Sequence, residues 1–311
     1  MTPPAGSAGP PDIVARARGL PGLVTAVVHP CDVPSLEAAI VARERGLIAP
    51  ILIGPEERIR AAAQAGGLDL SGCVIDPVPY SHAAAARGVQ LVRRAEAEAI
   101  MKGSLHTDEL MAEIVKAESG LRTARRISHV FVMQVPALER LLLVTDGAVN
   151  IDPSLEVKAD IVRNAIDLAR ALGIREPRVA ILSAVETVTS KLRSTLDAAA
   201  LCKMAERGQI AGGILDGPLA FDNAVSLAAA RTKGIASEVA GRADILVAPD
   251  LEAGNILAKQ LEYFAGALAG GVVLGARVPV ILSSRSDPLE SRVLSCAVAV
   301  LFAHSRRGAD A

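Results

Sequence analysis

Short apolar runs alternate with helical patterns along nearly the whole chain, and this alternation limits the folds that the sequence can adopt. The apolar runs have the length of buried strands, and the stretches between them are rich in Ala and Leu. Strands and helices that alternate in this way predict an α/β protein with a mainly parallel sheet. The predicted strands are residues 25–29, 50–53, 73–77, 141–145, 178–183, 212–215, 244–248, 271–274 and 278–283. The predicted helices include residues 35–46, 81–98, 107–118, 154–172, 193–207 and 252–267.

One predicted helix shows both of its ends in the sequence. Asp152 followed by Pro153 predicts an N-cap and a first helical residue. Gly173 stands where that helix would stop, which is a position that favours glycine.

The segment GLRTARRISHVFVMQVP, residues 120–136, interrupts the alternation. It has a basic turn followed by alternating strand-like residues, so we expect a hairpin or an arm that joins two domains or exchanges contacts between subunits. The alternation restarts near residue 143. The predicted domains are therefore residues 1–143 with 286–311, and residues 144–285.

Composition excludes several classes of protein. The chain has 311 residues, a net charge of −1, no Trp, two Tyr and four Phe, which argues against a nucleic-acid-binding surface. The N-terminal MTPPAGSAGPPD has no apolar core, so no signal peptide is predicted. Residues 264–282 are interrupted by glycines, Arg277 and Pro279, so a membrane span is not expected there. We expect a cytoplasmic protein. Structural zinc and a disulfide scaffold are not expected, because the four cysteines are far apart in the sequence: Cys31, Cys73, Cys202 and Cys296.

The segment PVILSSRSD, residues 279–287, places a polar turn between a predicted strand and a predicted helix. Ligands bind at such strand ends in parallel sheets. Ser284 and Arg285, with the amide groups of a helix start, would suit an anion. A helix cap is the alternative, with Ser286 or Asp287 as N-cap and Arg285 in solvent. The residues of this segment leave both readings open.

A second candidate anion loop is IMKGSLHTDE, residues 100–109. Lys102, Gly103 and Ser104 follow a short apolar run and precede a helix, so an ammonium and backbone amides could bind a phosphate. The order of residues is not that of a Walker A loop. A glycine turn with an exposed lysine is the alternative.

Three more loops carry polar groups after predicted strands. They are LVTDGAVNIDP (143–153) with Asn150, ILDGPLAFDNA (214–224) with Asp216, and VAPDLEAGNILAKQ (247–260) with Gly254, Asn255 and Lys259. Each alone is explained by turn chemistry, but together the strand ends predict a cleft for a phosphorylated or carboxylated ligand. The GxGxxG, GxSxG and HExxH motifs are absent from the sequence, and no metal site is predicted.

These loops resemble the phosphate acetyl/butyryltransferase family. The matching segments run in the family's order from about residue 100 to the C-terminal helix: MKGSLHTDELM, LLLVTDGAVNIDP, VAILSAVETV, ILDGPLAFDNAV, DILVAPDLEAGNILAKQL and PVILSSRSD. The resemblance implies two α/β/α domains around a cleft, similar to isocitrate and isopropylmalate dehydrogenases, in a homodimer or higher homo-oligomer. It also implies reversible acyl transfer between coenzyme A and inorganic phosphate in a ternary complex. The coenzyme A thioester is then a substrate, and no cofactor is expected.

The resemblance also implies roles for individual residues. Ser284, Arg285 and Asp287 are the expected catalytic residues, and Lys102, Gly103, Ser104 and Arg285 are expected to bind phosphate. The expected coenzyme A contacts are Asn150, Asp216, Asn255, Lys259, Arg122 and Arg126, with Arg125 beside them. One departure concerns the base for the coenzyme A thiol: Ser291 stands where the acetyltransferase branch has Asp, as expected of the butyryltransferase branch.

Acetyl transfer is the primary expectation, and three alternatives stay open. The first is the same reaction on a longer acyl chain, such as butyryl. The second keeps the fold but changes the reaction to an NAD-dependent dehydrogenation of a phosphorylated hydroxy substrate. The third is a non-catalytic acyl-CoA binder, which the missing base would suit.

Overall fold

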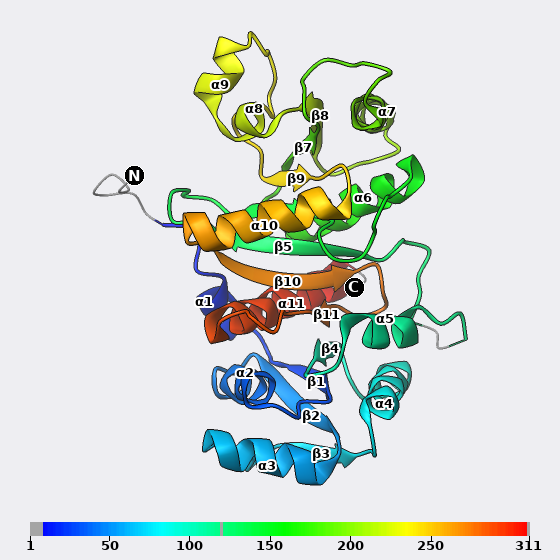
Figure 1. The fold of residues 1–311 in the computed structure, drawn as a ribbon, viewed down its shortest axis with the longest axis vertical. Coiled ribbons are helices and arrows are strands. Elements are labelled where there is room, and N and C mark those ends of the chain that lie inside the picture. The colour runs from blue at the N-terminus through cyan, green and yellow to red at the C-terminus, as the bar shows by residue number, and fades with distance from the viewer. Residues whose placement is uncertain (1–8, 119–120, 310–311) are drawn as a thin grey trace. The chain divides into compact units, whose positions relative to one another are not determined.

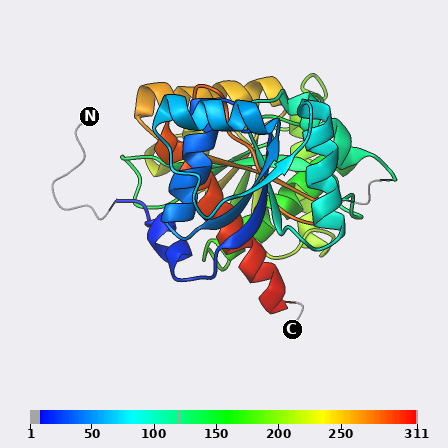
Figure 2. The ribbon, with the colours of Figure 1, turned by 90° about the horizontal axis from the view of Figure 1, so that it is seen from below.

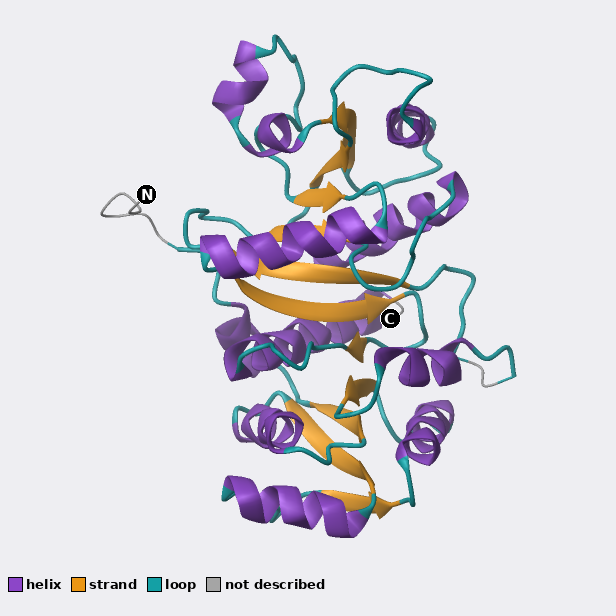
Figure 3. Cartoon of the chain, viewed as in Figure 1, coloured by secondary structure: helices purple, strands orange, loops and turns teal. Residues whose placement is uncertain are grey.

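A computed structural model describes residues 9–118 and 121–309 of the chain. The chain divides into two compact units, and each unit combines two segments of the sequence. The terminal unit consists of Asp12–Arg125 and Gly270–Ala311. The central unit consists of Arg126–Ala269, together with the N-terminal segment up to Pro11. Helices flank the strands in each unit (Figure 3).

The sheet of the terminal unit has the strand order β3-β2-β1-β4-β11-β10. Neighbouring strands from β3 to β11 run parallel, and β10 is antiparallel to β11. The strands are β1 (Leu23–Val28), β2 (Ile48–Gly54), β3 (Val74–Pro77), β4 (Ala99–Lys102), β10 (Leu268–Leu274) and β11 (Val280–Ile281).

Two groups of helices cover this sheet (Figures 1 and 2). One group is α1 (Ile13–Arg18), α11 (Leu289–Ala309), α2 (Val33–Glu44) and α3 (Glu56–Gly66), in which α11 contacts α1 and α2, and α2 contacts α3. The other is α4 (Ser81–Arg93) with α5 (Thr107–Val115). Asp32 caps α2 by accepting a hydrogen bond from the amide of Ser35 at 2.9 Å, so this helix starts just beyond the end of β1.

The sheet of the central unit has the order β5-β6-β9-β7-β8. Its parallel strands are β6 (Leu142–Thr145), β9 (Ile245–Val247), β7 (Arg178–Leu182) and β8 (Ile214–Leu219), and β5 (Ser128–Gln134) is antiparallel to β6. Helix α10 (Leu251–Ala265) and helix α6 (Leu155–Ala171) lie on opposite faces (Figures 1 and 2). The remaining helices are α7 (Arg193–Glu206), α8 (Phe221–Val225) and α9 (Leu227–Thr232). A core that includes Met133, Val144 and Leu246 joins the sheet to α8, α9 and α10.

The predicted fold class is confirmed: strands and helices alternate, and most strands are parallel. The prediction for residues 120–136 needs correction in its described part, which begins at Leu121; Gly120 lies outside the described residues. Residues 128–134 form β5, which pairs with β6 through registers such as Val130 with Thr145. The segment is a buried strand of the sheet, and the hairpin forms with the residues that follow it.

The predicted start of α6 was wrong, and its predicted end is confirmed. The N-cap is Ser154, whose hydroxyl accepts a hydrogen bond from the amide of Val157 at 3.4 Å. Asp152 instead pairs with Arg193. Gly173 follows the helix with a φ of 93°, a conformation that glycine adopts without steric cost.

The two units divide at residues 125/126 and 269/270, and the predicted domains divide at 143/144 and 285/286. Strand pairing explains the positions seen in the structure. Strand β5 pairs with β6 inside the central unit, and β11 pairs with β4 inside the terminal unit. Within the described ranges, no helix combines the length and apolarity that crossing a membrane requires.

Candidate functional site

Three neighbouring parallel strands of the terminal unit bring their carboxyl ends to one edge of the sheet. They are β1, β4 and β11, with registers such as Val28 with Lys102 and Ile281 with Met101. His29 follows β1, Gly103 and Ser104 follow Lys102 at the end of β4, and the turn 283–287 follows β11. Both anion loops predicted from the sequence therefore begin at the same edge of the sheet, which is where ligands bind in parallel sheets.

Lys102 is a buried cation at this edge, with 5% of its surface exposed. The predicted alternative of an exposed lysine is wrong. Burial lowers the pKa of Lys102, and the nearby positive charges of Arg285 and Arg292 lower it further, against smaller opposing effects of Asp32 and Asp287. A buried lysine whose charged form is disfavoured by neighbouring cations lies at a site where an anion gains electrostatic energy.

Gly103 and Ser104 fix the loop against the end of β1. The amide of Gly103 donates to the carbonyl of Val28 at 2.8 Å, and that of Ser104 donates to the carbonyl of His29 at 2.9 Å. A Cβ on Gly103 would lie 2.4 Å from the Val28 oxygen, so only glycine allows this close approach. The Ser104 hydroxyl donates to the His29 carbonyl and accepts from the amide of Cys31. These protein contacts hold Lys102 in place.

The turn 283–287 presents Arg285 at the surface. Ser284 and Arg285 are exposed, and the guanidinium of Arg285 lies 3.4 Å from Nδ1 of His106. The Asp287 carboxylate accepts a hydrogen bond from the amide of Ser284 at 2.7 Å and so closes the turn. Helix α11 begins only at Leu289, so neither Ser286 nor Asp287 is its N-cap. Arg285 is thus held at the surface of the protein, near the buried cations Lys102 and Arg292.

Arg292 supports this turn from inside α11. It is 5% exposed, and its guanidinium donates to the carbonyl oxygens of Ser284 at 3.0 Å, Arg285 at 3.1 Å and Asp287 at 3.1 Å. Sequence reasoning missed this residue. The available signal was a charged residue directly before buried apolar helix residues, which include Val293 and Leu294.

In the central unit, the loop after β6 is organised around the buried carboxylate of Asp146. This carboxylate accepts hydrogen bonds from the amides of Ala148 and Val149 and from the side chain of Asn150 at 2.6 Å. Burial nevertheless raises the pKa of Asp146. The loops after β7, β8 and β9 leave the same edge of the sheet, because these strands are parallel to β6.

The predicted coenzyme A contacts of the central unit are in part engaged with the protein itself. The Asn150 amide group also donates to the carbonyl of Ile127 at 2.9 Å, and that of Asn255 donates to the carbonyl of Gly147 at 2.9 Å. Lys259 pairs with Glu262 at 2.6 Å. Asp216 accepts a hydrogen bond from the amide of the next residue. Asn150 and Asn255 therefore come together at the 146–150 loop.

The predicted arginine contacts belong to different units and lie at the surface. Arg122 belongs to the terminal unit, where its backbone bridges to Ala276. Arg126 belongs to the central unit, where its amide donates to the carboxylate of Asp160 at 2.9 Å. Both residues are exposed. Their roles toward coenzyme A stay predictions.

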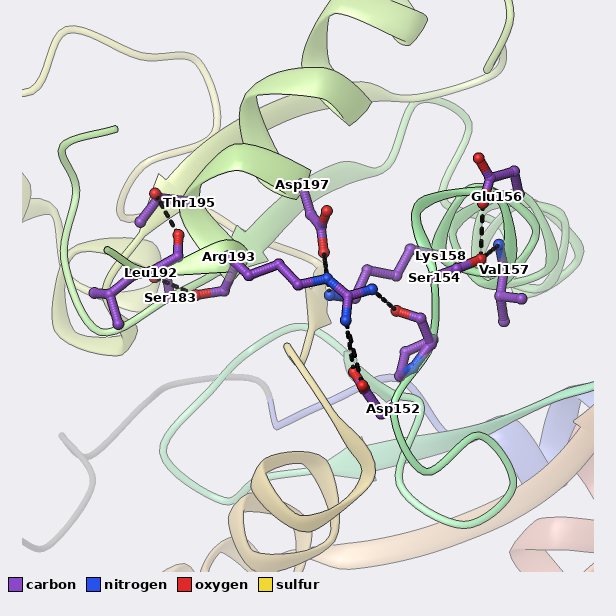
Figure 4. Close-up of polar contacts among 12 residues, drawn as sticks. Asp152, Ser154, Glu156, Val157, Lys158, Ser183, Leu192, Arg193, Thr195 and Asp197 are labelled. Atoms are coloured by element: carbon purple, nitrogen blue, oxygen red, sulfur yellow. Dashed lines mark hydrogen bonds and ion pairs between the residues drawn. The ribbon is translucent and has the colours of Figure 1, made fainter. Parts of the chain in front are cut away.

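A network of charged residues connects the end of the 146–154 loop to α6 and α7 (Figure 4). Arg193 contacts the carboxylate of Asp152 at 3.2 Å and donates to the carbonyl of Pro153 at 3.2 Å. It also lies 3.6 Å from Asp197, which forms a buried ion pair with Lys158 at 2.7 Å. The first turn of α7 is in this way attached to the loop that carries Asn150.

A family model described as "Phosphate acetyl/butaryl transferase" matches residues 80–300, which include both anion loops and the loops of the central unit. The chain belongs to the phosphate acetyl/butyryl transferase family. The expected resemblance is confirmed, and this member of the family is a transferase.

Relatives of this transferase match nearly its whole length. A phosphate acetyltransferase of Rhizobium meliloti is 61% identical over 96% of this chain and 94% of its own. A phosphate acetyltransferase of Rickettsia felis is 54% identical over 95% of this chain and 85% of its own. A phosphate butyryltransferase of Clostridium acetobutylicum is 40% identical over 95% of this chain and 98% of its own.

Solved structures agree with the fold of this transferase. A branched-chain phosphotransacylase from Enterococcus faecalis has a TM-score of 0.80 at 30% identity and covers 91% of this chain and 99% of its own. A 4-hydroxythreonine-4-phosphate dehydrogenase from Klebsiella pneumoniae has a TM-score of 0.56 at 14% identity and covers 91% of this chain and 100% of its own. The second likeness concerns the fold alone and confirms that this transferase has a dehydrogenase-like α/β fold.

Close packing explains why a glycine, Gly254, stands inside helix α10 of this transferase. A Cβ at this position would lie 2.2 Å from the carbonyl oxygen of Asp146. We expect Gly254→Ala to lower the free energy of unfolding by about 1–3 kcal/mol, because either α10 or the 146–150 loop must move. Urea denaturation measures the change. Gly308→Ala is the control, since that helical glycine has open space around it and should gain stability. Equal effects in the two variants would contradict the close contact.

His129 makes the stability of the central unit dependent on pH. It is fully buried, and burial together with the positive charge of Lys259 lowers its pKa to about 3. The unfolded chain takes up a proton near pH 6.5 and the folded protein does not, so stability falls as the pH decreases from 6.5 toward 3. We expect a loss of about 2 kcal/mol between pH 7 and pH 5 from this residue.

Denaturation of wild type and His129→Leu at pH 7 and pH 5 tests this expectation. The variant should lose less stability than wild type over this interval. Buried Asp146 is present in both proteins, so its own opposite contribution cancels in the comparison. A pH dependence that is the same in both would show that His129 accepts a proton in the folded state.

Proposed function

We propose that this chain catalyses the reversible transfer of an acetyl group between coenzyme A and inorganic phosphate, by direct reaction of the two bound substrates. One observation carries the proposal: Lys102, Arg285 and Arg292 place three positive charges at one edge of a parallel sheet. Phosphate is the small anionic substrate that such an arrangement suits. The identity with phosphate acetyltransferases over nearly the full chain supports the same reaction.

The reaction forms one bond and breaks one bond. An oxygen of phosphate attacks the thioester carbonyl carbon, giving a tetrahedral intermediate with negative charge on the former carbonyl oxygen. The carbon–sulfur bond then breaks, and acetyl phosphate and the coenzyme A thiolate are released. In the reverse direction the thiolate attacks acetyl phosphate. The thioester is a substrate, so the proposed reaction uses no cofactor and no metal.

The residues of the terminal unit suit separate parts of this reaction. Arg285 is exposed at the turn and offers a planar guanidinium to phosphate oxygens, and Ser284 beside it offers a hydroxyl to the developing oxyanion. Lys102 supplies a further, buried positive charge close to Arg285 and Arg292. The thiolate needs no strong base when several positive charges lie close, because they favour the ionised thiol. Asp287 is the nearby carboxylate, and it closes the turn.

A longer acyl chain is the second candidate substrate, and one residue favours it. Ser291 is a buried hydroxyl residue at the position where the acetyltransferase branch carries Asp. The 40% identity with a phosphate butyryltransferase is compatible with this chemistry. We also propose a homodimer or higher homo-oligomer that acts in the cytoplasm, where the four free thiols of this chain would stay reduced.

A thiol-release assay tests the proposed function. Acetyl-, propionyl- and butyryl-CoA are supplied with and without inorganic phosphate, and the free thiol is measured. Phosphate-dependent release that is fastest with acetyl-CoA is expected. Fastest release with butyryl-CoA would favour the second candidate, and no phosphate-dependent release with any thioester would overturn both. Thermal stabilisation by NAD but not by coenzyme A would indicate a dehydrogenase.

A further inference from the structure

The turn that carries Arg285 is held by a side chain that lies seven residues further along the chain. The guanidinium of Arg292 donates to three backbone carbonyls, those of Ser284, Arg285 and Asp287, at 3.0–3.1 Å. All three acceptors lie within the turn 283–287, and Asp287 is its last residue. A rigid planar guanidinium that reaches three oxygens of one turn fixes the direction in which that turn points its side chains.

The burial of Arg292 is costly for the fold alone. Its side chain is 5% exposed, and the acceptors that it contacts are neutral carbonyl oxygens. A buried charge of this kind loses hydration that neutral acceptors restore only in part. Its charge also acts on Lys102, because it disfavours the protonated form of that lysine. A bound anion would offset these costs.

The same helix contains an arginine with similar backbone contacts at a distance from the turn. Arg306 donates to the carbonyl oxygens of Ala276 and Arg277 at 3.4 Å each, and its guanidinium lies over the ring of Phe302. Backbone support by an arginine of α11 is therefore not restricted to the turn. A comparison of variants at Arg292 and Arg306 therefore distinguishes a residue that only stabilises the fold from one that supports the phosphate site.

We propose that Arg292 is a positioning residue of the phosphate site, which orients the turn so that Arg285 meets phosphate and which adds a buried positive charge close to Lys102. This inference rests on the proposed function. It assigns to Arg292 an effect on phosphate that should exceed any effect on the thioester, because its contacts and its charge act at the anion site. Arg292 acts through the turn, and Arg285 is the residue that contacts the substrate.

The test compares Arg292→Met, Arg292→Lys and Arg306→Met in the thiol-release assay. Arg292→Met is expected to raise the KM for phosphate about 10- to 100-fold, the effect of losing charge-assisted hydrogen bonds, and to leave the KM for acetyl-CoA close to wild type. Arg292→Lys keeps the charge and loses the planar fork, so its KM for phosphate should lie between those of wild type and Arg292→Met. Arg306→Met should match wild type in both constants.

Several outcomes would overturn the positioning role. One is an unchanged KM for phosphate in Arg292→Met, and another is an equal rise in both KM values. If Arg292→Met does not fold, Arg292→Lys decides alone, and a wild-type KM for phosphate in that variant would overturn the role. The failure of the proposed function is seen separately, as absence of phosphate-dependent thiol release in wild type. In that case thermal stabilisation by inorganic phosphate replaces the KM, and equal stabilisation of wild type and Arg292→Lys would overturn the inference.

Discussion

Replacement of Arg285 with alanine is expected to lower the rate of phosphate-dependent thiol release by roughly 100- to 1000-fold, because the charge-assisted hydrogen bonds from its guanidinium to phosphate oxygens are lost. The side chain is exposed at the turn, and its hydrogen-bond distance to His106 is a long 3.4 Å. The turn itself is held by Arg292 and Asp287. Activity should therefore be lost while the fold and its thermal stability are retained.

Arg207→Ala is the matched control for this variant, because Arg207 is an exposed arginine in the central unit at the end of α7. It should keep wild-type activity. Circular dichroism and thermal melts of both variants establish that they are folded. Wild-type rates in Arg285→Ala would contradict the assignment of this residue to the phosphate site.

Replacement of Asp197 with alanine is expected to destabilise the central unit by about 3–5 kcal/mol, because it leaves Lys158 as an uncompensated buried charge. Lys158 is 4% exposed, and its ammonium lies 2.7 Å from the Asp197 carboxylate. This loss corresponds to a decrease in Tm of roughly 6–20 °C for a unit of this size. Calorimetry measures the transition, and urea denaturation gives the free energy of unfolding.

The double variant Lys158→Met with Asp197→Leu tests whether the loss of stability comes from the unpaired buried charge or from the residues around the pair. Two apolar side chains should restore most of the stability that Asp197→Ala loses, since neither charge is then buried. A double variant as unstable as Asp197→Ala would show that the loss comes from packing or from Arg193. That arginine contacts both Asp197 and Asp152.

Local sequence patterns were sufficient to predict the strand ends but not their neighbours in space. The apolar run before Lys102 and the one before Ser283 each end in polar residues, which predicts two loops at strand ends. That these strands are adjacent depends on the pairing of Ile100 with Val280, and no local pattern carries this long-range information. The choice between Asp152 and Ser154 as N-cap was similarly beyond the sequence, because both residue types cap helices.

The roles of polar side chains were harder to predict than their positions. Asn150 and Asn255 were expected to contact a ligand, and their amide groups donate to protein carbonyls or to Asp146. A polar residue beside a glycine turn has the same appearance in a sequence whether it binds a ligand or organises its own loop. Arg292 illustrates the opposite error. No local pattern singled out this helix residue, because its acceptors are backbone carbonyls of a turn five to eight residues earlier.

The discontinuity of the terminal unit affects how the protein is made on the ribosome. Residues 126–269 form a continuous segment that can fold as soon as it has been synthesised. The first part of the terminal unit must wait for β11 and α11, which come from the last part of the chain. Lys102 and Arg285 therefore come together only after residues 126–269 have been synthesised.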